Sequence, residues 1–319
     1  MYAPIFTIVA LVAGTASAQC ENVNIQSSSD VATANSCTKI GSLMISGEDL
    51  TEVKLSSVQQ ISSIRVTATS TLQKVEMSKL TSASSLEINN NSGLTSASFP
   101  SLSELAGYLF ISGNSPKILF SAPKLGKIGG NATFSNCTGI DVGSLKSVNN
   151  QFSLTGNAAT NISLSNLETV ASSLTFAANE QLTGLSLEKL TTIGGALVVA
   201  NNTKLDSISF PTLANVAGGL ELYVTASKID FPALESVRGG ALIQTDNKAQ
   251  TCDDLKKLSA PIEGSFKCTD GSSSGGKGGK NSSSSSGSKN STGTSSNAIT
   301  TGASALPFVA AVSALAFLL

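Results

Sequence analysis

The sequence predicts a mainly β chain folded as a single right-handed parallel β-solenoid of about ten turns. Two observations carry this prediction. A short pattern, which opens with two or three small residues and then Leu-x-Leu, recurs ten times at a spacing of 20 to 24 residues, the period of a solenoid. Both halves of each copy alternate apolar and polar residues, so we expect two short strands per turn.

The first strand of each copy directs a pair of apolar residues into the core. Nineteen of the twenty paired positions are apolar in a chain that is 40% hydrophobic, which excludes chance. The pairs are Leu43/Ile45, Ile64/Val66, Leu86/Ile88, Leu109/Ile111, Ala132/Phe134, Phe152/Leu154, Leu174/Phe176, Leu197/Val199, Leu220/Leu222 and Leu242/Gln244.

Two columns of side chains are expected to face outward from these strands. The residues between the paired positions are Met44, Arg65, Glu87, Phe110, Thr133, Ser153, Thr175, Val198, Glu221 and Ile243. The second column is Ser46, Thr67, Asn89, Ser112, Ser135, Thr155, Ala177, Ala200, Tyr223 and Thr245. Its small hydroxyl and amide groups could hydrogen-bond an extended glycan or a partner's loop, or form plain solvated surface.

A third column, five residues after the start of each copy, predicts an inward asparagine ladder. It holds Asn91, Asn114, Asn157, Asn179, Asn202 and Asn247, whose amides would hydrogen-bond the backbone of a neighbouring turn, while Glu48 and Thr69 fill the slot in the first two copies. Cys137 occupies the same slot, so we interpret it as a buried free thiol. A reactive thiol is the alternative.

Four further cysteines flank the repeats. Cys20 and Cys37 precede the first copy, and Cys252 and Cys268 follow the last. A solenoid exposes an apolar cross-section at each end and needs caps there. The pairs Cys20–Cys37 and Cys252–Cys268 would each close a small loop over one end, whereas a straight solenoid keeps the two ends too far apart to be bridged.

The composition excludes several classes of function. A net charge of −1 provides no basic surface for nucleic acid. The chain contains no histidine, which removes the usual general base and the usual zinc ligand. Glu87 and Glu221 lie six turns apart in the outward column, so the sequence offers no paired carboxylates for glycan cleavage. We therefore predict no catalytic residues, no metal and no cofactor.

The N-terminus predicts a secretory signal peptide over residues 1–18. The apolar run 5–13 is followed by Ala16-Ser17-Ala18, a small-x-small cleavage site that would leave Gln19 as the mature start. A buried strand that begins the solenoid is the alternative interpretation.

The C-terminus predicts a glycosylphosphatidylinositol (GPI) anchor. Residues 271–297 contain twelve Ser and seven Gly, a composition typical of a disordered stalk. An uncharged apolar tail ends the sequence, so residues 298–319 are expected to be removed when the anchor is attached. Ser296 is the predicted attachment residue, with Asn297 and Gly293 as alternatives. A tail-anchored helix is the other interpretation, and it conflicts with a signal peptide.

Seven asparagines begin N-glycosylation sequons. Five lie within the predicted solenoid of residues 19–270 (Asn90, Asn131, Asn136, Asn161 and Asn201) and two in the stalk (Asn281 and Asn290). Asn90, Asn136 and Asn201 each stand one residue before a ladder position. Their sugars are therefore expected to rise from one edge of the rod and to leave another face for contacts.

The repeats resemble those of the receptor L-domain and leucine-rich-repeat group. The Gly-Gly-x-Leu openings, the turns Phe99-Pro100-Ser101-Leu102, Phe210-Pro211-Thr212-Leu213 and Phe231-Pro232-Ala233-Leu234, and the terminal cysteine pairs occur here together with a stalk and an anchor signal. In this order they resemble the fungal GPI-anchored cell-wall organisation proteins of the extracellular-mutant-33 and sporulation-specific-2 family.

That resemblance implies a non-enzymatic surface glycoprotein of the plasma membrane outer leaflet or the cell wall. Its expected role is wall organisation and integrity, as a scaffold or binding rod, with β-glucan, chitin or mannoproteins as partners. Two alternatives remain open. One is a glycanase on a β-solenoid, and the other is an adhesin or receptor that binds a protein ligand.

Overall fold

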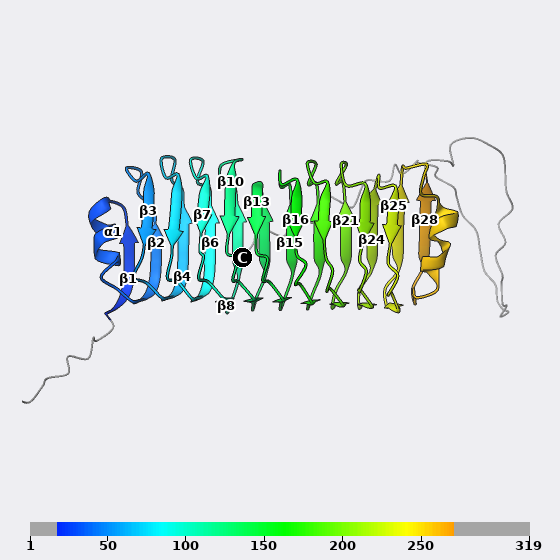
Figure 1. The fold of residues 1–319 in the computed structure, drawn as a ribbon, viewed down its shortest axis with the longest axis horizontal. Helices are drawn as coiled ribbons and strands as arrows, with labels where there is room; N and C mark the ends of the chain where they lie inside the picture. Colours follow the sequence, from blue (N-terminus) through cyan, green and yellow to red (C-terminus); the bar gives the residue numbers. More distant parts are fainter. Residues whose placement is uncertain (1–17, 271–319) are drawn as a thin grey trace, which may run out of the picture. The chain divides into compact units, whose positions relative to one another are not determined.

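The computed structural model describes residues 18–270, which form a parallel β-solenoid of about 11 turns. The strands follow one another along a rod with a short helical segment at each end (Figure 1). The predicted fold class is confirmed. The solenoid extends beyond the ten predicted repeats at both ends. Strand β1 (Gln19–Ile25) pairs with the first repeat, and β28 (Phe266–Asp270) pairs with the last.

Each turn contributes strands to three columns, which we number in chain order. The first column, which begins with β1 and ends with β28, contains the strands that carry the Leu-x-Leu pairs. Between them lie β2 (Lys39–Ile45), β4 (Gln60–Thr67), β6 (Ser82–Asn89), β9 (Leu109–Ser112), β12 (Ala132–Ser135), β15 (Phe152–Thr155), β18 (Leu174–Ala177), β21 (Leu197–Ala200), β24 (Leu220–Val224) and β27 (Ala241–Thr245).

The second column matches the predicted second strand of each copy. Its strands are β3 (Glu52–Leu55), β5 (Lys74–Met77), β7 (Ser96–Ser98), β10 (Ile118–Ser121), β13 (Cys137–Asp141), β16 (Asn161–Ser163), β19 (Gly184–Ser186), β22 (Ser207–Ser209) and β25 (Lys228–Asp230).

A third column was not predicted. It consists of two-residue strands, each too short for an alternating pattern to be visible in the sequence. They are β8 (Glu104–Leu105), β11 (Lys127–Ile128), β14 (Ser147–Val148), β17 (Thr169–Val170), β20 (Thr192–Ile193), β23 (Asn215–Val216) and β26 (Ser236–Val237). In the early turns this column is continuous with the first, because β6 pairs with both β8 and β9.

The predicted inward pairs form the core, with one correction. Ala241 and Ile243 of β27 are buried and pair with Leu220 and Leu222, so Leu242 and Gln244 face outward instead. With this one-residue shift every repeat places two apolar residues inside. Phenylalanines pack against one another between turns within the core. The rings of Phe120 and Phe134 meet edge to face with centroids 5.4 Å apart, and those of Phe210 and Phe231 are stacked at 5.1 Å.

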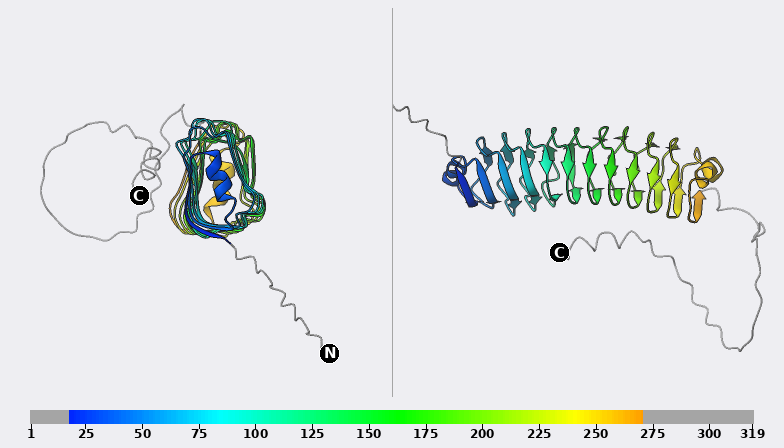
Figure 2. Two further views of the ribbon diagram at one scale, coloured as in Figure 1. Left: turned by 90° about the vertical axis from the view of Figure 1, so that its left-hand side faces the viewer. Right: turned by 90° about the horizontal axis from the view of Figure 1, so that it is seen from below.

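Both ends of the solenoid carry a disulfide and a short helical cap. Helix α1 (Ser28–Ala34) lies across the opening of the first coil (Figure 2, left). Helix α2 (Cys252–Leu255) and the 3₁₀ turn η1 (Lys256–Ser259) pack at the other end. The predicted bonds Cys20–Cys37 and Cys252–Cys268 are both present, so each cap is joined covalently to a strand of the first column.

Candidate functional site

The outer surface of the first column, called here the first face, is the largest regular surface of the rod. By strand register both predicted outward columns lie on it as far as β24, but Thr175 and Ala200 are buried, so the prediction that these two are exposed was wrong. The predictions of Ile243 and Thr245 as outward residues were wrong, because both side chains are completely buried by the shifted register of β27. Leu242 and Gln244 take their places.

An ionic and aromatic cluster stands out on the first face, and it consists of Arg65, Glu87, Asn89, Tyr108 and Phe110. The Arg65 guanidinium lies 2.9 Å from Glu87 Oε2, and the Asn89 side-chain amide donates to Glu87 Oε1 at 2.6 Å. The Tyr108 hydroxyl donates to Glu87 Oε2 at 3.3 Å. Glu87 is thus bound by side chains from its own strand and from the strands on both sides.

The second outward carboxylate, Glu221, lies on β24, six strands further along the first column. At the spacing of parallel strands this is roughly 29 Å from Glu87, too far for the two to act on one glycosidic bond. Glu221 instead neighbours Tyr223 on the same strand. Partial burial raises the pKa of the Tyr223 phenol, and the Glu221 charge raises it further.

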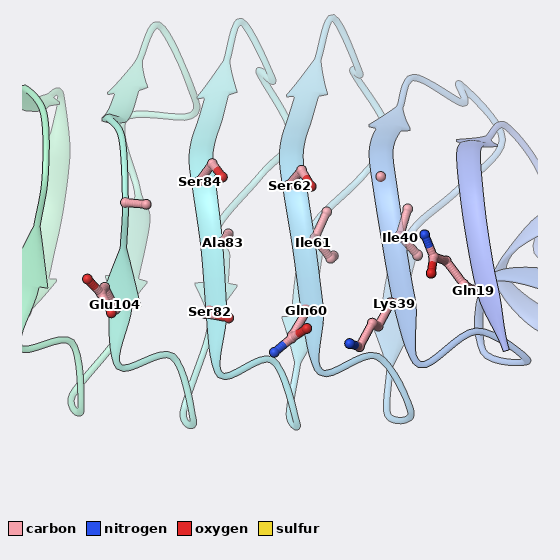
Figure 3. Close-up of a pocket in the computed structure, with 12 residues that line it drawn as sticks. Gln19, Lys39, Ile40, Gln60, Ile61, Ser62, Ser82, Ala83, Ser84 and Glu104 are labelled. Atoms are coloured by element: carbon pink, nitrogen blue, oxygen red, sulfur yellow. The ribbon is translucent and has the colours of Figure 1, made fainter. Parts of the chain in front are cut away.

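A shallow hollow of about 390 Å³ crosses the early strands at the edge of the first face. Lys39, Gln60, Ser82 and Glu104 line one side of it on successive turns (Figure 3). Glu104 is the only carboxylate in its lining, and its Oε1 lies 3.8 Å from the Lys127 ammonium. The hollow therefore offers hydrogen-bonding groups but no pair of acids.

The predicted asparagine ladder is present in two runs. Asn91 donates to Asn114 Oδ1 at 2.9 Å, and Thr69 in turn donates to Asn91 Oδ1 at 2.8 Å. The second run links Asn157, Asn179 and Asn202, each of which donates its side-chain amide to a backbone carbonyl of the preceding turn. These buried amides hold consecutive turns in register.

Cys137 separates the two runs, as its position predicts. It is completely buried and unpaired, and its backbone N–H donates to Asn157 Oδ1 at 3.0 Å. Burial raises the pKa of the thiol to about 12. The interpretation as a buried free thiol is confirmed. Asn247 also donates to a backbone carbonyl of the preceding turn, that of Thr225 at 2.8 Å, as predicted. It is partly exposed, however, so its assignment to the buried ladder was wrong.

Three of the sequon asparagines share one corner of the coil. Asn90, Asn136 and Asn201 are exposed and adopt the left-handed backbone conformation, with φ of 54°, 61° and 56°. Ala68 takes the same conformation on the turn before Asn90, and Gly113, Gly156 and Ala178 do so on the turns between the three asparagines. The predicted alignment of these three sites is therefore present, although attachment of sugars stays a prediction.

Glycines face several sequon asparagines from the next turn. A Cβ on Gly113 would lie 2.6 Å from Asn90 Oδ1, and one on Gly184 would also collide with Asn161 Oδ1. The φ angle alone does not require glycine in the left-handed corner, because Ala68 adopts the same conformation. Because glycine has no side chain, Gly113 and Gly184 leave space for the Asn90 and Asn161 side chains and for sugars attached to them.

The remaining sites differ in their surroundings. Asn131 is exposed on the first face, at the start of β12, and Asn161 begins β16 in the second column. Asn281, Asn290 and the predicted attachment residues Ser296, Asn297 and Gly293 lie outside the described residues, as do the stalk, the apolar tail and nearly all of the predicted signal peptide.

Within residues 18–270 there is no cluster of three or more acidic or cysteine side chains that could hold a metal ion. No helix in this part of the chain is long and apolar enough to cross a membrane. No protein-family model, curated protein or solved structure matches the chain. The site must therefore be interpreted from its own geometry.

Proposed function

We propose that the protein is a GPI-anchored surface glycoprotein that organises the fungal cell wall as a non-enzymatic rod. It would stand on the outer leaflet of the plasma membrane or in the wall itself. The observation that carries this proposal is the separation of surfaces on the rod. Three of the five sequon asparagines of the described chain share one corner, whereas the first face carries mostly polar groups, together with the aromatic cluster and Asn131.

The construction of the rod suits an extracellular role. Disulfides at both ends and an unbroken core between them resist fraying in an oxidising compartment. Hydroxyl and amide groups repeat along the first face at the strand spacing of about 4.8 Å. Such a surface could align β-glucan, chitin or the sugars of mannoproteins through many weak hydrogen bonds.

The two acids of the first face are not paired, which favours this function over the glycanase. Glu52 and Glu76, which lie close together on the second column, are both bound by the Lys74 ammonium, at 3.1 and 2.9 Å. Hydrolysis of a glycosidic bond usually requires two carboxyl groups about 5 to 10 Å apart. Glu87 is engaged by Arg65, and Glu221 lies six turns away. If the protein were nevertheless a glycanase, Glu87→Gln or Glu221→Gln would abolish cleavage.

Incubation with wall polymers tests the proposal. The glycosylated protein would be mixed with insoluble β-glucan, chitin and mannan-coated beads, and retention would be measured together with new reducing ends. We expect retention on at least one polymer without new ends, unchanged in Glu221→Gln. New reducing ends that disappear in Glu221→Gln would refute the non-enzymatic role. If none of the three polymers retains the protein, a protein ligand is favoured instead.

A further inference from the structure

Asn131 differs from the other sequon asparagines because its neighbour across the sheet is aromatic. Leu109 of β9 pairs with Ala132 of β12, so the preceding residues, Tyr108 and Asn131, also lie side by side. Both are exposed at the surface, and Tyr108 is 39% exposed, one of the few large apolar side chains in the described chain to be so.

A second ring extends this surface. Phe110 follows Tyr108 by two residues, so both side chains are on the first face. Its partner across the sheet is Thr133, the third residue of the same sequon. The sequon and the two rings therefore occupy adjacent positions on two paired strands, about 4.8 Å apart.

The hydrogen bonds of this region fix both partners. Tyr108 is tethered through its hydroxyl to Glu87 on the side of the preceding strand, at 3.3 Å. Asn131 Oδ1 accepts a hydrogen bond from the Gln151 backbone N–H at 3.2 Å, which orients the amide and leaves Nδ2 as the point of sugar attachment. The backbones of Asn131 and Tyr108 lie about one strand spacing apart, and because Oδ1 is held by Gln151 on the following turn, Nδ2 is the amide atom on the other side.

A pyranose ring presents C–H groups on its faces, and a tyrosine offers an apolar ring with a polar tip. Packing the two together removes apolar surface from water. Because the sugar is covalently attached beside the ring, its effective concentration there is high.

We propose that the N-linked glycan on Asn131 packs against Tyr108 and Phe110 and covers this part of the first face. This inference rests on the proposed function, since it requires a secreted, glycosylated chain. It also deepens that function: the aromatic cluster is occupied by the protein's own sugar, and wall polymers or partners are left with the strands on either side.

The tyrosine content allows a direct test. The chain has three tyrosines and no tryptophan, and Tyr2 lies in the predicted signal peptide. In the variant Tyr223→Phe, Tyr108 is then the only tyrosine of the secreted chain. Full-length Tyr223→Phe protein from a glycosylating fungal host would be nitrated with tetranitromethane, and the nitration rate of Tyr108 would be followed by mass spectrometry.

The glycan is removed from this background in two ways. Thr133→Val abolishes the sequon while it keeps Asn131 and its hydrogen bond. Peptide N-glycosidase treatment removes all N-linked sugars and converts each asparagine that carried one to aspartate. Asn201→Gln removes a sugar from the corner and serves as the matched control. We expect several-fold faster nitration of Tyr108 after either treatment at Asn131, and no change in the control.

Stability gives a second measurement. We expect loss of the Asn131 glycan to lower the melting temperature by about 2–4 °C, the shift typical of a small contact in a chain of this size. In Tyr108→Ala the same loss should leave the melting temperature almost unchanged.

Equal nitration rates with and without the sugar would overturn the inference. So would glycopeptide analysis showing Asn131 unmodified while Asn90 or Asn136 carries sugar, and that result would leave the proposed function intact. A chain that is neither secreted nor glycosylated at any sequon would refute the proposed function as well.

Discussion

Gly113 lies directly against Asn90 on the preceding turn, with no room for a side chain between them. A Cβ added to Gly113 would stand 2.6 Å from Asn90 Oδ1. Both residues have a positive φ, 64° for the glycine and 54° for the asparagine. Alanine adopts this conformation at other turns of the same corner, so the glycine is explained by its neighbour and not by its backbone angle alone.

Replacing Gly113 with alanine is therefore expected to destabilise the solenoid. The left-handed conformation costs a residue with a Cβ about 1–2 kcal/mol, and the exposed Asn90 side chain would have to move aside at a small further cost. Gly143→Ala is the matched control, because a Cβ there would meet only Asp141 Oδ1 at an ordinary 3.8 Å. Urea denaturation measures the free energy of unfolding of both variants. An Asn90→Ala background should remove only the small part of the cost that comes from moving the Asn90 side chain, and a Gly113→Ala variant as stable as the wild-type protein would contradict the account.

The ladder predicts an asymmetry between two asparagines. Asn157 donates both its backbone and its side-chain N–H to Asn179 Oδ1, at 2.9 and 3.0 Å. Asn179→Ala leaves these buried donors without an acceptor and should lower the free energy of unfolding by about 3 kcal/mol. Asn247→Ala, off the ladder, should change it by less than about 1 kcal/mol. Similar losses in the two variants would argue against the ladder as a stabilising element.

Cys137 predicts a pH dependence of stability. Its thiol pKa is raised from 9.0 to about 12 by burial, so the folded state holds the proton more tightly than the unfolded state. The stabilisation is fully present below pH 9 and is lost as the pH rises towards 12, by at most about 1.4 kcal/mol per pH unit.

Thermal unfolding at pH 8 and pH 10 measures this effect. The melting temperature should decrease more from pH 8 to pH 10 in the wild-type protein than in Cys137→Ala. In addition, a thiol reagent at pH 8 should label Cys137 only after unfolding. Rapid labelling of the folded protein would show that the thiol is accessible and reactive.

The C-terminal disulfide is expected to act locally. Its loop spans 16 residues, and its loss in Cys252→Ala/Cys268→Ala should cost about 3 kcal/mol in the chain-entropy model. Because turns of a solenoid contact only their neighbours, hydrogen exchange should increase first in β27 and β28. Uniform loss of protection from β9 to β28 would contradict local capping.

Much of this architecture could be predicted from the sequence because one residue pattern repeats. Alternation with a period of two specifies which side chains face inward, and nine of the ten first-strand pairs were assigned correctly. The tenth was not, because Ala241, Leu242 and Ile243 are consecutive apolar residues, so alternation does not show which of them face inward. In the structure Ile243 is buried and Gln244 is exposed. The error in Asn247 followed from the same shift.

Other features depend on contacts between turns and are invisible within one copy. The two-residue strands, such as β11, carry too little pattern to be recognised. The cluster around Glu87 requires side chains from three adjacent strands. Four of its members appeared in the sequence only as separate outward positions, and Tyr108 was not predicted at all. The relation of Gly113 to Asn90 could have been found by aligning the corner residues of successive copies.

Rescue of a wall defect is the most direct test of the central claim, a non-enzymatic rod held at the cell surface. A fungal strain that lacks its own copy would receive the full-length chain, the double variant Glu87→Gln/Glu221→Gln, or a chain that ends at residue 297. Growth in the presence of a wall-binding dye would be compared at matched expression. We predict that the full-length chain and the double variant restore resistance, whereas the shortened chain is secreted and fails. Failure of a folded, surface-exposed double variant, or full rescue by the shortened chain, would contradict the account.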